Sequence, residues 1–268
     1  MRTFLYATLL SALAISARAA TSGGIGDLLV TPTRIVLDHR TRTAEIALIN
    51  TGSSPATYRI EIQHMRMREN GDLTPVDEQA GDFADALVQF SPRSVKLQPH
   101  IAQTVRLRLR PPAGPMAGEL YLHLLFRGEP PEETGPAILD GSSLTIRLTP
   151  VYGVAIPVLV RLDETEAAVH IDAVHLAAES AVAFKVERSG NRSTYGNIAV
   201  TFTPRGGRAR EIAVVHGVSV YTPLTARSMT LPLHLPDGVA LRDGSLQVSY
   251  VDAERNGAPA TSATLALP

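Results

Sequence analysis

Alternation of apolar and polar residues is the feature that most limits what this chain can fold into. It is clearest in Thr104–Arg110, where Val105, Leu107 and Leu109 are separated by arginines. A period of two sends successive side chains to opposite faces of a strand, so the apolar residues face a core while the arginines face solvent. This segment therefore predicts a half-buried β-strand rather than a helix.

Similar short runs recur along the chain, and turns rich in glycine and proline separate them. In the first half they are Leu28–Leu37, Ala44–Ile49, Tyr58–Met65, Leu87–Phe90, Thr104–Arg110, Leu120–Phe126 and Leu144–Arg161. In the second half they are Val169–Leu176, Ala181–Arg188, Asn197–Phe202, Ile212–Val215, Ser228–Leu235, Leu246–Val251 and Ala263–Leu267. Two sets of about seven short strands predict an all-β fold of two Ig-like β-sandwich domains. Only Asp82–Leu87 favours a helix, and a short one.

Residues 1–19 have the pattern of a secretory signal peptide. Arg2 precedes an apolar run, Phe4–Ile15, and Ala17–Ala19 forms a cleavage site of the A-x-A type. The apolar run is too short to span a bilayer. We therefore expect export, cleavage after Ala19 and a mature protein that is not embedded in a membrane.

An acid-rich stretch, Leu162–Glu166, separates the two sets of strands and predicts a hinge. We accordingly expect an N-terminal Ig-like domain over residues 20–162 and a C-terminal β-sandwich domain over residues 163–268.

Residues that carry chemistry are sparse. The chain has no cysteine, and its eight histidines are scattered. The absence of cysteine excludes disulfides, thiolate metal sites and cysteine nucleophiles. Nucleophile elbows, phosphate-binding loops and zinc-protease motifs are also missing. A formal net charge of -1 excludes a generally basic nucleic-acid-binding protein. We expect no enzyme activity, no cofactor, no metal and no nucleic-acid partner.

Several segments, taken in their order and spacing, resemble one known family. They are Leu29–Leu37, Pro55–Arg59, Phe90–Pro99, Gln103–Arg106, Gly118–Tyr121, Ser189–Gly196 and Tyr250–Asp252. Together they resemble the periplasmic pilus and fimbrial assembly chaperones (PapD-like, of the chaperone–usher pathway), as a divergent member. The resemblance implies two Ig-like domains in an L or boomerang arrangement, located in the periplasm. It also implies two partners, namely pilin subunits and an outer-membrane usher.

Family members insert the last strand of their first domain into a subunit whose own fold lacks a strand, and this mode needs exposed apolar residues at every second position. Residues 144–154 match that strand. Leu144, Ile146 and Leu148 share one face, and Tyr152 continues it. The alternative is that this face packs inside the chain's own sandwich, as alternating strands usually do. Pro150 removes a backbone donor and limits clean pairing there.

The family also holds the C-terminal carboxylate of the subunit with two cations in the cleft between its domains. Arg34 matches the first of these, and a guanidinium can bind a carboxylate through two parallel hydrogen bonds. Where the family has a lysine, this chain has Pro157. Either another arginine such as Arg147 supplies the second cation, or the anchor differs.

Glu119, Arg161 and Asp252 match an ionic cluster that links the two domains in the family. Such a cluster fixes the angle between domains more than it adds stability. The alternative is three unconnected surface charges, which contribute little.

Two other functions are compatible with a secreted all-β chain. One is a secreted Ig-like structural or adhesion module. The other is a carbohydrate-active enzyme, against which the absence of tryptophan counts, because sugar-binding platforms rely on aromatic area. For a chaperone, an unoccupied apolar donor edge also favours self-association.

Overall fold

The structure is a computed structural model that describes residues 27–77, 83–110, 112, 114–130, 151–235, 240–254 and 259–268. The strands of the first half are β1 (Leu28–Thr31), β2 (Ile35–Leu37), β3 (Thr43–Asn50), β4 (Ala56–Gln63), β5 (Met65–Met67), β6 (Leu73–Pro75), β7 (Val88–Ser91), β8 (Ser94–Leu97), β9 (Ala102–Leu109), β10 (Gly118–Glu129) and β11 (Gly153–Leu162). Those of the second half are β12 (Ala167–Ala178), β13 (Ala181–Gly190), β14 (Thr194–Pro204), β15 (Arg210–Val220), β16 (Ala226–Pro232), β17 (Gly244–Asp252) and β18 (Pro259–Leu267).

The first sandwich packs a sheet of order β1-β3-β9-β7 against a sheet of order β2-β11-β10-β4-β8. In β9, Val105, Leu107 and Leu109 are buried between the sheets and the arginines face outward, as the alternation predicts. Side chains such as Leu48 and Phe126 complete this core from the other strands. The predicted strand Leu28–Leu37 is instead two strands, because the chain leaves one sheet after Thr31 and enters the other at Ile35.

The second sandwich packs β12-β13-β16 against β15-β14-β17-β18. Its separate core includes Phe184, Val200 and Tyr250, and every described strand of this half contributes to one of the two sheets. The expected all-β fold of two sandwiches is thus confirmed. The only helix among the described residues is a short 3-10 turn, Asp85–Leu87, inside the segment where a short helix is predicted.

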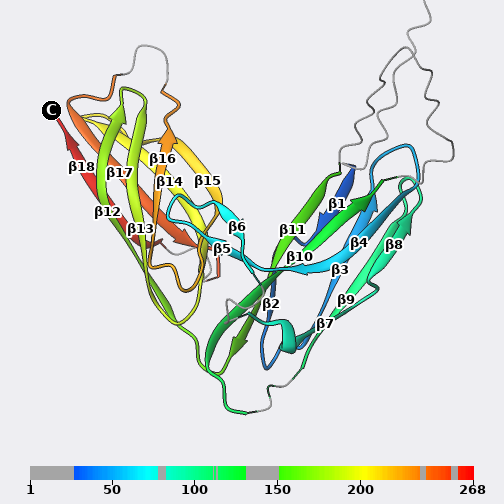
Figure 1. The fold of residues 1–268 in the computed structure, drawn as a ribbon. Helices are drawn as coiled ribbons and strands as arrows, with labels where there is room; N and C mark the ends of the chain where they lie inside the picture. Colours follow the sequence, from blue (N-terminus) through cyan, green and yellow to red (C-terminus); the bar gives the residue numbers. More distant parts are fainter. Residues whose placement is uncertain are drawn as a thin grey trace, which may run out of the picture.

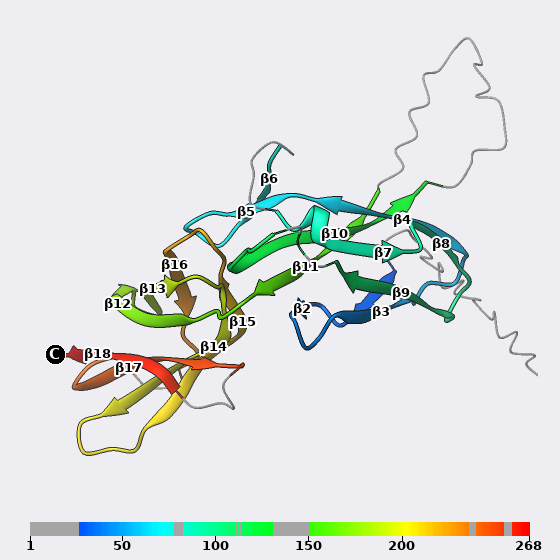
Figure 2. The same cartoon turned by 90° about the horizontal axis from the view of Figure 1, so that it is seen from below.

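The two sandwiches form the arms of a V and meet where β11 leads into β12 (Figure 1). Asn191 forms two side-chain hydrogen bonds with the predicted hinge. It accepts one from the backbone N–H of Glu166 and donates one to the carbonyl of Glu164. The hairpin β5–β6 reaches from the first arm toward β16 (Figure 2). There the carbonyl of Glu69 accepts a hydrogen bond from the N–H of Ser228.

A third, smaller apolar cluster joins the arms. Tyr121 and Leu159 of the first sandwich pack against Tyr221 of the second. These contacts give the joint its own core, so the two sandwiches are packed against each other as well as linked by the chain.

Some expectations fall outside the described residues. They are the signal peptide over residues 1–19, the donor residues Leu144, Ile146 and Leu148, and Arg147, the alternative second cation. Within the described residues, no helix is long and apolar enough to cross a membrane.

Candidate functional site

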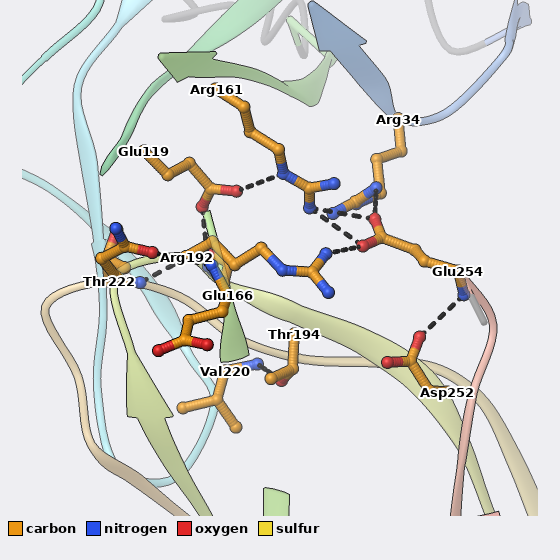
Figure 3. A network of polar contacts seen from close by, with 12 residues as sticks. Arg34, Glu119, Arg161, Glu166, Arg192, Thr194, Val220, Thr222, Asp252 and Glu254 are labelled. Atoms are coloured by element: carbon orange, nitrogen blue, oxygen red, sulfur yellow. Dashed lines mark hydrogen bonds and ion pairs between the residues drawn. The ribbon is translucent and has the colours of Figure 1, made fainter. Parts of the chain in front are cut away.

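Three arginines converge on one carboxylate where the two sandwiches meet (Figure 3). Glu254, just after β17, accepts a hydrogen bond of 2.8 Å from Nη1 of Arg34. Nη2 of Arg161 lies 3.0 Å from both of its carboxylate oxygens. Nη1 of Arg192 contacts its second oxygen. Glu254 therefore bridges two arginines of the first sandwich, Arg34 and Arg161, and one arginine of its own sandwich, Arg192.

Glu119 completes this cluster from β10. Its carboxylate accepts hydrogen bonds from Nε of Arg161 (3.0 Å) and from the backbone N–H of Ser193 (2.9 Å). Its side chain is fully buried. Glu119 and Arg161, two of the three residues expected in an interdomain cluster, are thus in contact. From the second sandwich, Glu254 contacts Arg161, and Asp252 accepts a hydrogen bond of 2.8 Å from the backbone N–H of Glu254.

The electrostatics of Glu254 follow from this arrangement. Burial by itself would raise the pKa of Glu254. The hydrogen bond from Arg161 and the charges of Arg34, Arg161 and Arg192 outweigh burial and hold that pKa below its usual value. The carboxylate therefore stays ionised, and the bridge between the sandwiches persists over the neutral range.

Arg34 has a second edge that this bridge does not use. It lies in the link between β1 and β2, and its guanidinium carbon is 4.6 Å from the ring centroid of Tyr195, so that the cation stacks on the ring. Its Nε and Nη2 atoms are buried and have no hydrogen-bond partner among the described residues. These two N–H groups form the parallel fork that suits a carboxylate.

Arg34 also lines a pocket of about 360 Å³ between the two sandwiches. The first sandwich contributes Thr33, Arg34 and Pro157, and the second contributes Tyr195, His216, Gly217, Ser219 and Tyr221. We call this the interdomain pocket. Pro157, at the position where the resemblance expects a lysine, is thus a neighbour of Arg34 in space.

Among the described residues, the first half of β11 forms an open edge. β11 pairs with β10 along its whole length, but β2 pairs with it only over Val158–Val160. Among the described residues, no strand covers the other side of residues 153–157. Proline tolerates such a position because no neighbouring strand requires its missing N–H. Just before this edge, Val151 and Tyr152 are 47% and 56% exposed.

Sequence reasoning missed several residues of this region. Glu254 follows Asp252 by two residues, so the matched motif ended just short of it. Arg192 lies inside a matched segment, and His216 carried no signal because it is an isolated histidine in a strand. Among the described residues, no group of three histidine, cysteine or acidic side chains is placed to hold a metal ion.

No family model matches the sequence, and no curated protein matches it either. Among solved structures, the chain is similar to the E. coli chaperone DraB, with 15% identity, a TM-score of 0.46 and coverage of 90% of this chain and 96% of that one. It is also similar to the Pseudomonas aeruginosa CupB2 chaperone, with 12% identity, a TM-score of 0.45 and coverage of 89% and 100%.

A third similar structure is that of the Salmonella enterica SafA pilin in complex with the SafB chaperone, with 15% identity, a TM-score of 0.44 and coverage of 90% and 96%. Each of these three structures contains a chaperone, and in the third the chaperone is in complex with a pilin. At these sequence identities and TM-scores, the similarity concerns the path of the backbone alone. The side-chain contacts described above are observations on this chain.

Proposed function

We propose that this protein is a periplasmic chaperone that binds and stabilises fimbrial subunits and delivers them to an outer-membrane usher. In this proposal residues 144–154 donate a strand to the subunit. Arg34 binds the C-terminal carboxylate of the subunit.

One observation carries the proposal: the open edge of β11 and the interdomain pocket meet at Pro157. Pro157 is the last uncovered residue of that edge and also a wall of the pocket. A strand that adds to the edge therefore ends beside the unused fork of Arg34. Backbone pairing along the edge would supply affinity, and the fork would fix the register by holding the end of the chain.

This arrangement sets the direction of the added strand. Its carboxyl end must lie at Pro157, and its earlier residues must lie along Gly153 and the segment before it. Such a strand runs parallel to β11. Tyr152 already extends along β10, because its carbonyl accepts a hydrogen bond of 3.0 Å from the N–H of Gly128.

The side chains of β11 and of the residues before it alternate between two faces in the way that strand donation needs. Val154 and Ile156 of β11 point into the first core, and Tyr152 has the same parity but is exposed beyond it. Leu144, Ile146 and Leu148 would continue this row, given the period of two in a strand. Apolar residues that extend past their own core are suited to fill the core of a second protein.

Replacing Ile146 and Leu148 together by threonine should reduce capture of the subunit at least about tenfold, because two buried apolar side chains would be lost from the shared core. Co-purification from periplasmic extract, with the bound subunit quantified by mass spectrometry, measures this. The matched control replaces Thr145 and Thr149, on the opposite face, by alanine. Undiminished capture by the Ile146→Thr/Leu148→Thr protein would rule out donation by this segment.

Arg34→Ala should weaken binding of a peptide from the C-terminus of the captured subunit about tenfold, because a bidentate charge-assisted contact is lost. The fold should persist, since Glu254 keeps its contacts with Arg161 and Arg192. Arg106→Ala, in an exposed ion pair with Glu45, is the control. Equal affinity of the Arg34→Ala and unmodified proteins would remove Arg34 from the anchor.

Cell fractionation separates this proposal from the alternative of a secreted structural or adhesion module. The chaperone remains in the periplasm, whereas a module would be found in the assembled extracellular fibre.

A further inference from the structure

We propose that His216 is the second cationic contact of the interdomain pocket and makes carboxylate binding there dependent on pH. This inference rests on the proposed function, in which the ligand is the terminal carboxylate of a polypeptide. In this inference, His216 of the second sandwich makes the cationic contact that Pro157 of the first sandwich cannot make.

A β-bulge presents His216 to the pocket. In the pairing of β14 with β15, Gly196 faces Val218 and Ile198 faces Val215, so that Asn197 alone faces both His216 and Gly217. Bulges bend a strand locally and re-aim a side chain, and they are common beside functional sites. The extra residue takes His216 out of the regular ladder.

Gly217 makes this bulge possible. Its φ is +72°, a conformation that glycine adopts without strain. The side-chain oxygen of Asn197 accepts a hydrogen bond of 3.2 Å from the backbone N–H of Gly217. A Cβ at this position would lie 3.5 Å from the ring of Tyr195, which stacks on Arg34. The bulge therefore lies beside the tyrosine that stacks on Arg34.

The charges around His216 favour an anion. The titratable groups that line the pocket with it are Arg34 from the first sandwich and Tyr195 and Tyr221 from the second. Burial raises the pKa of Tyr221 to about 12, so this phenol is neutral in the physiological range. Among the described lining residues there is no carboxylate, and Glu254 contacts Arg34 through Nη1, away from the Nε and Nη2 edge.

The resulting site pairs a permanent cation with a switchable one. Arg34 offers two parallel donors to a carboxylate, while a histidine gains or loses its charge between about pH 5 and pH 8. Protonation of His216 adds a second charge-assisted contact. Binding should therefore be tighter at the acidic end of this range and weaker at the basic end.

The probe is N-acetyl-alanyl-tyrosine with a free carboxylate, titrated into the mature full-length protein at about pH 6 and about pH 8 and followed by NMR, since histidine changes charge between these values. We expect its Kd to be about fivefold lower at the acidic pH, and the carboxamide form of the same peptide not to bind. His216→Gln should remove the pH dependence, and His216→Lys should restore tight binding at both pH values. His216 is exposed, so thermal unfolding of these variants should match that of the unmodified protein.

The outcomes separate the inference from the proposed function. If the peptide binds in an Arg34-dependent manner but His216→Gln keeps the same pH dependence, the role of His216 is wrong while the anchor stands. If Arg34→Ala binds the peptide as well as the unmodified protein does, the proposed anchor itself is wrong. Absence of any binding, or equal binding of acid and amide, overturns both.

Discussion

Replacing Glu119 by glutamine should lower the free energy of unfolding by about 3 kcal/mol, the usual cost of breaking a buried ion pair from one side. The carboxylate of Glu119 is fully buried and accepts hydrogen bonds from Arg161 and from the N–H of Ser193. A glutamine has one acceptor oxygen for these two donors, and it leaves the charge of Arg161 to Glu254 alone.

Urea unfolding followed by circular dichroism measures this effect. The matched control is Glu45→Gln, which removes a carboxylate from an exposed pair with Arg106, with side chains 62% and 79% exposed. An exposed pair of this kind contributes less than about 1 kcal/mol, so the control should unfold nearly as the unmodified protein does. Similar losses for the two variants would mean that the interdomain cluster has no special role in stability.

A second large effect should come from His123. This histidine is fully buried, and both of its ring nitrogens lack a hydrogen-bond partner among the described residues. On its sheet it lies between Gln63 and Pro157, and Tyr221 covers it from the other sandwich. Burial lowers the pKa of His123 from 6.5 to about 4.

The sign of the pH dependence follows from this shift. The unfolded chain binds a proton at His123 more readily than the folded chain, so acidification favours unfolding. The contribution of His123 is constant above the unfolded pKa, and stability falls as the pH drops from 6.5 to about 4. A difference of about 2.5 pKa units corresponds to a loss of about 3 kcal/mol over that interval.

His123→Phe keeps an aromatic ring against Tyr221 and has no proton to gain. Its free energy of unfolding should therefore change about 3 kcal/mol less than that of the unmodified protein between pH 6.5 and pH 4. Comparing the two proteins cancels the contributions of the carboxylates, including Glu254. His170→Gln, a change at an exposed histidine, is the control. Parallel pH profiles of the His123→Phe and unmodified proteins would contradict the expectation.

Local patterns in the sequence were sufficient for the long strands. The alternation in β9 predicts both the strand and its buried face, because the pleat of a strand assigns side chains to faces without reference to the rest of the fold. The change of sheet between β1 and β2 was not predictable, since both pieces are apolar and extended and only their partners differ. The hairpin β5–β6 was also missed, because its two strands have only three residues each.

The candidate site was predicted in part. Arg34, Glu119 and Arg161 came from matched segments, and they do meet at the joint. Glu254 and Arg192 complete the cluster from the second sandwich, more than 200 and more than 150 positions after Arg34 in the chain. A local pattern contains no information about pairs so far apart.

The sequence by itself therefore determined the all-β class, the two sets of strands and the arginine at the joint, because these follow from periodicity and from short motifs. Only the tertiary structure decided that Glu254 bridges the sandwiches, that the open edge of β11 ends at the pocket, and that His216 and Arg34 line the same pocket. The physical reason is that ion pairs, edges and pockets are properties of surfaces that folding brings together. Their energies depend on distance and burial, which the packing of the two sandwiches sets.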